Sequence, residues 1–327
     1  MALTKHPIAD LIARRGGLVI DGAMSTPLEA AGLNLNDTLW SAKALLECPD
    51  LVRKVHYDYY AAGANAVEAC SYQATEAAFA RKGIEKAEAS RLIRLSGELV
   101  REAKNDVLLE HPEWDPADLL TAGSIGPYGA YLADGSEYTG AYDLTREEYY
   151  AFHQLRLDEL LNSGMDILAI ETQPRFDEIE ALLAMIADRD ITCWVTVTLK
   201  DGDMPDGTKL EVLAKCLDAD PHVEAFGFNC IKREWVEPGL KRLSAYTDKP
   251  LVVYPNSGET YDPTTKTWHA QGVHEPDWNH YVPLWEHTGA RCIGGCCRTL
   301  PKDIVQITDL LHISGPPTRC QAVYRCF

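Results

Sequence analysis

The stretch Ile293-Gly294-Gly295-Cys296-Cys297-Arg298-Thr299 lies where a short apolar run that begins at Arg291 ends. Side chains on a regular strand alternate between its two faces, so adjacent cysteines on a strand cannot both point to one centre. The two glycines before the cysteines relax this limit, because glycine adopts backbone conformations that other residues avoid. A sharp bend at the strand end would therefore let both sulfurs face the same point.

Three interpretations of the Cys296-Cys297 pair remain open at this stage: two buried thiols, a vicinal disulfide, or half of a metal site. Zinc usually takes three protein ligands in catalytic sites and four in structural sites. A zinc site would therefore require a further ligand from elsewhere in the chain.

Composition excludes several classes of partner and location. The chain has 327 residues, 46% of them hydrophobic, and a net charge of −18 without a basic block, so neither nucleic acid nor membrane is an expected partner. No apolar run approaches the roughly 20 residues of a membrane span, and the N-terminus lacks a signal peptide's apolar core. Ten scattered cysteines fit reduced thiols better than a disulfide scaffold. We therefore expect a soluble cytoplasmic protein, and a homo-oligomer is compatible with this composition.

Short apolar runs alternate with helical patterns along the whole chain. The expected strands are 18–20, 65–72, 119–124, 166–171, 192–199, 224–230, 250–254 and 291–294. The expected helices are 50–62, 85–109, 145–162, 177–187, 210–217, 235–246 and 278–287, and Pro301 is expected to open the last one. Eight such units predict a single-domain α/β fold, a (β/α)8 TIM-type barrel over residues 1–313, whereas a doubly wound sheet would more often have fewer units. Residues 314–327 have no helical period and are expected to form an irregular C-terminal tail.

Active sites of such barrels form at the carboxyl ends of the strands. The residues expected there are mostly polar: Asp21, Tyr72, Ser124, Glu171, Asn229, Cys230, Asn256, Cys296 and Cys297. Cys230 ends the sixth expected strand and the cysteine pair ends the eighth, so the three sulfurs should face one mouth of the barrel. The remaining cysteines are interpreted as core thiols (Cys48, Cys70, Cys193, Cys216 and Cys292) or as incidental residues of the tail (Cys320 and Cys326).

Three thiolates favour zinc over cations that prefer oxygen ligands. We expect one Zn²⁺ per chain, with a fourth position open for substrate. A zinc ion with three thiolates is a poor Lewis acid for activating water, but it can hold a substrate thiol as a thiolate. A free thiol has a pKa of about 8.5 and is mostly protonated at neutral pH, and metal binding removes that proton.

Six segments at the expected strand ends carry distinctive motifs: 21–26 (DGAMST), 71–75 (SYQAT), 123–129 (GSIGPYG), 227–230 (GFNC), 254–259 (YPNSGE) and 294–299 (GGCCRT). Together they resemble the homocysteine S-methyltransferase family from about residue 8 to residue 312. The resemblance is closest to the branch that uses S-methylmethionine or S-adenosylmethionine. It implies a zinc-dependent barrel that methylates L-homocysteine to methionine, with the metal on Cys230, Cys296 and Cys297.

The resemblance also implies how the amino acid is held. Asp21 and Glu171 would bind the amino group, and the backbone amides of Met24 and Ser25 would meet the carboxylate. Tyr72 would lie beside the metal. We add Asn229 and Asn256 as expected substrate contacts because they end the sixth and seventh strands.

Several alternatives remain open from the residues themselves. Asp21 and Glu171 could be the acid/base pair of a hydrolase or could cap helices. Tyr128, Tyr131 and Trp268 could shelter a sulfonium cation by cation–π contact, or could simply pack. The cysteines would also suit a zinc-binding or thiol redox-sensing protein without catalysis, and the same barrel could use betaine or a methylfolate as donor.

Overall fold

The computed structural model describes residues 4–258, 260–262, 267–269 and 277–311. Parallel strands form one sheet in the order β1-β10-β7-β6-β5-β4-β3-β2. Their bounds are β1 (Leu18–Val19), β2 (Ala66–Glu68), β3 (Leu120–Ile125), β4 (Ile167–Gln173), β5 (Cys193–Val197), β6 (Val223–Asn229), β7 (Leu251–Tyr254) and β10 (Ala290–Ile293). A parallel bridge between Ile20 and Ala66 joins the two outer strands, so the sheet closes into the expected (β/α)8 barrel.

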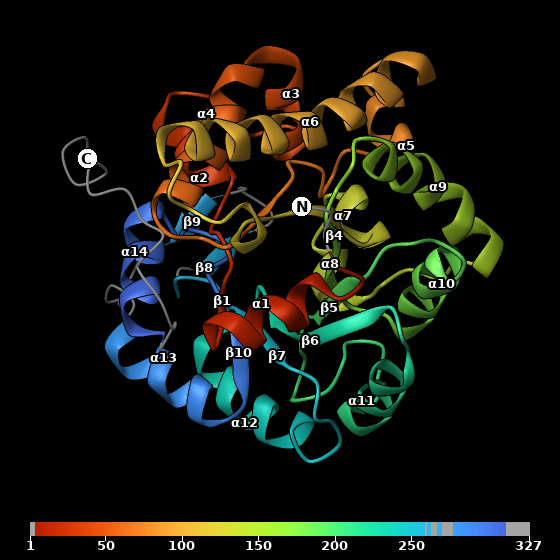
Figure 1. Cartoon of the computed structure of the whole chain (residues 1–327). Coiled ribbons are helices and arrows are strands. Elements are labelled where there is room, and N and C mark those ends of the chain that lie inside the picture. Colours follow the sequence, from red (N-terminus) through yellow and green to blue (C-terminus); the bar gives the residue numbers. More distant parts are fainter. Residues whose placement is uncertain (1–3, 259, 263–266, 270–276, 312–327) are drawn as a thin grey trace.

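Helices surround the strands (Figure 1). The helices predicted from the sequence are α4 (Pro49–Ala61), α6 (Lys86–Glu110), α9 (Arg146–Asn162), α10 (Phe176–Ile186), α11 (Leu210–Ala219), α12 (Arg233–Leu243), α13 (Trp278–His287) and α14 (Pro301–Leu310). Shorter elements that the sequence analysis did not predict are α1 (Pro7–Arg15), α2 (Ser25–Ala30), η1 (Trp40–Lys43), α3 (Ala44–Glu47), α5 (Glu76–Ala80), η2 (Pro116–Asp118), α7 (Tyr128–Leu132), α8 (Ser136–Thr139), and the hairpin of β8 (Thr260–Asp262) and β9 (Thr267–His269).

Each barrel strand contributes to two apolar cores because its side chains alternate in direction. In β4, Ile167 and Ala169 belong to the cluster inside the barrel, whereas Leu168 and Ile170 pack against the outer helices. Helix α1 adds Ile8 and Leu11 to the inner cluster. It therefore covers the amino ends of the strands (Figure 1), so that only the carboxyl ends are open to form a site.

The second strand is shorter than predicted. It ends at Glu68, and the chain then turns, with the Ser71 amide donating to the Ala69 carbonyl at 2.7 Å. Tyr72 therefore lies in a loop rather than at a strand end. Cys70 is a core thiol as predicted, but it lies in the same loop and not in the strand.

No helix in the described ranges combines the length and apolarity that crossing a lipid bilayer requires. The predicted C-terminal tail, 314–327, lies outside the described residues.

Candidate active site

A cavity lies at the carboxyl ends of the barrel strands. Nine of the residues predicted for this end of the barrel line it: Asp21, Met24, Ser25, Tyr72, Ser124, Glu171, Cys230, Cys296 and Cys297. Further residues of its wall include Trp40, Glu68, Cys70, Glu137 and Tyr138. The barrel therefore brings most of the predicted residues to one place.

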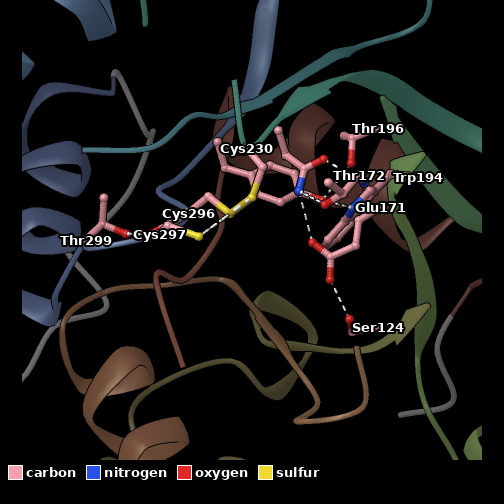
Figure 2. Close-up of a disulfide and its surroundings, with 11 residues drawn as sticks. Ser124, Glu171, Thr172, Trp194, Thr196, Cys230, Cys296, Cys297 and Thr299 are labelled. Atoms are coloured by element: carbon pink, nitrogen blue, oxygen red, sulfur yellow. Dashed lines mark hydrogen bonds between the residues drawn. A yellow bond between two sulfur atoms is a disulfide. The ribbon is translucent and has the colours of Figure 1, made fainter. Parts of the chain in front are cut away.

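Strand alternation explains why Glu171 points into this cavity. It follows Ile167 and Ala169 at a spacing of two residues, so it continues the inward face of β4. Its carboxylate accepts hydrogen bonds from the Ser124 hydroxyl and, at 3.1 Å, from the Asn229 amide. Figure 2 shows Glu171 between Ser124 on one side and the cysteine cluster on the other. The carboxylate is thus held in place before any ligand binds.

Three carboxylates gather at the base of the cavity: Asp21, Glu68 and Glu171. Burial and the charge of Glu171 raise the pKa values of both Asp21 and Glu68, and burial raises the pKa of Glu171 to about 7. Oδ1 of Asp21 and Oε1 of Glu68 are buried without a hydrogen-bond partner among the described residues. Buried oxygens of this kind normally have partners, so the base of the cavity suits a cation that donates hydrogen bonds.

The three predicted metal ligands lie together. Their sulfurs are all within 4.8 Å of one another, and Sγ of Cys297 is 4.0 Å from Sγ of both Cys230 and Cys296. Cys230 and Cys296 are joined by a disulfide (Figure 2). This differs from the expected reduced thiols, and it is not the vicinal disulfide that the sequence left open.

A metal fits this cluster once the disulfide is reduced. Tetrahedral zinc with Zn–S bonds of about 2.3 Å separates its sulfurs by about 3.8 Å, which is close to the distances that Cys297 makes. Burial, followed by the charges of Glu171 and Glu137, raises the pKa of the Cys297 thiol to about 12. A nearby cation would therefore be needed to keep this sulfur as a thiolate at neutral pH.

The local backbone explains how adjacent cysteines reach one cluster. Strand β10 ends at Ile293, so Cys296 and Cys297 lie in the turn beyond it, where the Thr299 hydroxyl donates to the Cys296 carbonyl at 2.6 Å. The two glycines were expected to allow this bend through conformations that other residues avoid; the bend is present, but neither glycine has a positive φ. Gly295 is needed because a Cβ there would collide with the Thr299 side chain.

Left-handed backbone occurs instead at Cys230 and directly after the Cys296-Cys297 pair. Cys230 has a φ of 49° and Arg298, directly after the pair, has a φ of 67°. Such conformations are costly for residues other than glycine and often occur at functional sites. Here they turn the chain at the ends of β6 and β10 so that the sulfurs meet.

Two predicted substrate contacts do not line the cavity. Asn229 is fully buried and holds Glu171 and Thr172 by hydrogen bonds, so it supports the carboxylate from behind. Asn256 is half-buried, and its amide nitrogen in the backbone donates to the Ile231 carbonyl at 3.2 Å.

The aromatic residues that could have sheltered a sulfonium cation do not line the cavity in the described part of the structure. Tyr128 and Tyr131 contact each other and Phe152, outside the cavity wall, which agrees with the packing alternative. Trp268 lies in β9, and its side chain is outside the described part of the structure.

Tyr72 is positioned by a buried arginine. Nη1 of Arg156 donates to the Tyr72 carbonyl at 2.6 Å, and Nη2 donates to the Gly126 carbonyl at 2.6 Å. A Cβ at Gly126 would lie 2.6 Å from the Tyr72 ring, so this glycine leaves room for the phenol. Burial is the main cause that raises the pKa of Tyr72, which therefore stays neutral.

Two acidic residues of the cavity, Glu68 and Glu137, were not predicted from the sequence. Glu68 could have been found, because it follows Ala66 at the two-residue spacing of an inward face. Glu137 lies in the long connection between β3 and α9, where no periodic pattern indicated its position.

Comparisons with known proteins agree on one family. The sequence model of the family described as homocysteine S-methyltransferase matches residues 18–311. A curated homocysteine S-methyltransferase of Escherichia coli is 49% identical over 304 residues, which cover 92% of this chain and 97% of that protein. The metallated form of the homocysteine methyltransferase MmuM from Escherichia coli superposes with a TM-score of 0.83 at 46% identity, covering 92% of this chain and 98% of that one. The oxidized form of the same enzyme gives a TM-score of 0.84 at 45% identity, covering 93% and 99%.

Proposed function

The chain is a methyltransferase that belongs to the homocysteine S-methyltransferase family, and from this membership we propose that it transfers a methyl group from a sulfonium donor to the thiol of L-homocysteine, forming methionine. One observation carries the proposal: three cysteine sulfurs line the same cavity as the three carboxylates at its base. The first group suits a soft metal and a thiol, and the second suits an α-ammonium. Homocysteine carries both a thiol and an α-ammonium.

We propose zinc as the metal, one per chain, held by reduced Cys230, Cys296 and Cys297. Three thiolates favour zinc over cations that prefer oxygen. Bound zinc would supply the positive charge that lets a thiol lose its proton at neutral pH. The proposal is supported by the metallated form of the similar Escherichia coli enzyme.

The carboxylates orient the amino acid. Asp21 and Glu171, with Glu68 beside them, would accept hydrogen bonds from its ammonium group, and the unpartnered oxygens of Asp21 and Glu68 support this assignment. Met24 and Ser25 line the same cavity at the start of α2, and their backbone amides would bind the carboxylate. An amino acid anchored in this way directs its side-chain thiol toward the cysteine cluster, with Tyr72 alongside.

The transfer itself exchanges one sulfur–carbon bond for another. The thiol sulfur attacks the donor's methyl carbon, the bond from that carbon to the sulfonium sulfur breaks, and the donor leaves as a neutral thioether. The thiol proton passes to solvent. Because opposite charges are neutralised, little full charge remains in the transition state, and the residues of the cavity contribute mainly alignment and exclusion of water.

We propose S-methylmethionine as the preferred donor. The test is methionine formation by reduced, zinc-loaded protein with homocysteine and each donor in turn. S-methylmethionine should give a higher kcat/KM than S-adenosylmethionine, and betaine should react slowly or not at all because an amine is a poorer leaving group than a thioether. A clear preference for betaine would refute the sulfonium assignment.

The alternative of a redox-sensing protein without catalysis has one supporting observation, the disulfide between Cys230 and Cys296. It gives no role to the three carboxylates at the base of the cavity. Zinc-loaded protein that turns over none of the donors would favour this alternative. The predicted cytoplasmic location and oligomeric state stay predictions.

A further inference from the structure

Glu137 is a cavity residue to which neither the family resemblance nor the mechanism above gives a role. It lies in the short helix α8. The flanking residues Gly135 and Gly140 have φ values of 89° and 62°, which turn the chain at both ends of the helix. Helix α7 packs closely beneath it, since a Cβ at Gly129 would lie 2.6 Å from the Glu137 backbone nitrogen. Packing of the α7 backbone against α8 therefore helps to position Glu137.

The Glu137 carboxylate has an unused oxygen in the cavity wall. Its Oε2 is buried and has no hydrogen-bond partner among the described residues. A buried acceptor without a partner is costly unless a ligand or water satisfies it. The observation suggests a positively charged ligand on this side of the cavity.

Glu137 lines the cavity together with the three cysteines of the proposed metal site. Asp21, Glu68 and Glu171 act on one another at its base, and the Glu171 carboxylate already accepts hydrogen bonds from Ser124 and Asn229. Glu137 is therefore a carboxylate of the cavity that stands outside this group. Trp40, Tyr72 and Tyr138 line the same cavity, and aromatic rings attract cations.

We propose that Glu137 is the counter-ion of the donor's sulfonium group, in a subsite whose wall also includes Trp40, Tyr72 and Tyr138. This inference rests on the proposed function. Homocysteine's ammonium already has the three carboxylates at the base. The methyl group must come within about 3.5 Å of the thiol at the cysteine cluster, so the donor's positive sulfur must enter the cavity that Glu137 lines together with the cysteines.

Charge neutralisation determines which kinetic constant Glu137 affects. The carboxylate attracts the sulfonium in the bound ground state, but the sulfonium charge is partly lost in the transition state. Glu137 therefore contributes to donor binding and does not accelerate the chemical step. Its loss should raise the donor KM without lowering kcat, which a merely structural role would not produce.

The test is Glu137→Gln in the reduced, zinc-loaded protein at pH 8. We expect the KM for S-methylmethionine to rise about 10-fold or more, with kcat equal to or above that of the wild type. The KM for homocysteine and the zinc content should not change. Glu147→Gln removes an exposed carboxylate from the first turn of α9 and should leave every constant unchanged.

Trimethylsulfonium, which carries a positive sulfur and no amino group, identifies the part of the donor that is recognised. Its inhibition constant against S-methylmethionine should rise by the same factor in Glu137→Gln. An unchanged donor KM, or an unchanged trimethylsulfonium inhibition constant, would overturn the assignment.

Two further measurements keep the proposal testable if the variant does not fold or if the wild type is inactive. If Glu137→Gln does not fold, Glu137→Asp keeps the charge and should retain binding of trimethylsulfonium, and loss of that binding in folded Glu137→Asp would count against the proposal. If the wild type makes no methionine, the proposed function fails. Calorimetric binding of trimethylsulfonium to the wild type and Glu137→Gln proteins still tests the subsite in that case, with equal affinities overturning it.

Discussion

Replacing Glu171 by Gln tests how the cavity holds an amino acid. The side chain is 5% exposed, and its carboxylate already has the Ser124 hydroxyl and the Asn229 amide as donors, so the substitution removes charge while conserving shape. Loss of a buried charged partner of an ammonium costs about 2 to 5 kcal/mol. We therefore expect homocysteine to bind about 30-fold to several thousand-fold more weakly.

Isothermal titration calorimetry of homocysteine into reduced, zinc-loaded protein at pH 8 measures this loss. Zinc content should be unchanged, because Glu171 is not one of the proposed ligands. Glu147→Gln serves as the control for loss of one exposed negative charge. An unaltered homocysteine affinity in Glu171→Gln would refute the anchoring role.

The pH dependence provides an independent check on Glu171. Burial raises its pKa to about 7 in the ligand-free protein, and only the ionised form pairs with an ammonium. Homocysteine affinity of the wild type should therefore fall as the pH drops below about 7, and Glu171→Gln should flatten this slope. An equally steep slope in the variant would exclude Glu171 as its origin.

The raised pKa of Glu171 affects folding stability in the opposite direction, because stability falls as the pH rises. A folded-state pKa above the unfolded value gives stability that is present at low pH and lost as the pH rises through about 7. The ligand-free Glu171→Gln protein should therefore become more stable than the wild type at pH 8, by about 3 kcal/mol at most. Thermal unfolding at pH 5 and pH 8 measures this difference, and a variant that is no more stable at pH 8 would contradict the assigned pKa.

Three further predictions concern the cysteine cluster. Cys230→Ser, Cys296→Ser and Cys297→Ser should each lose most of the zinc measured by atomic emission, whereas Cys292→Ser, which changes a buried thiol in β10, should keep it; full zinc retention in any of the first three would refute the ligand set. Oxidised protein should bind no zinc until a thiol reductant opens the Cys230–Cys296 disulfide, and equal zinc uptake before and after reduction would contradict this. Gly295→Ala should lower both zinc affinity and the melting temperature, because its Cβ would displace Thr299 from the turn that holds Cys296; a variant with wild-type zinc affinity would show that the turn tolerates a side chain.

The barrel and the grouping of the three cysteines follow from the sequence alone. Strand and helix periodicities are local, and eight alternating units leave few ways to bury their apolar faces, so the barrel strands and the long helices between them were predicted to within a few residues. Cys230, Cys296 and Cys297 were placed together because carboxyl ends of parallel strands meet at one face of a barrel. Glu171 followed from the same rule.

Packing across the whole fold sets where each strand stops and which loop residues reach the cavity. Local pattern does not show that β2 ends at Glu68, because the end depends on the turn beyond it, and this placed Tyr72 in a loop and Glu68 in the cavity. Asn256 was assigned to the substrate because it follows a strand, yet it lies off the cavity wall. Glu137 reaches the cavity because α7 and α8 pack together over it, and contacts between loops depend on packing across the whole fold, which no periodicity in the sequence records.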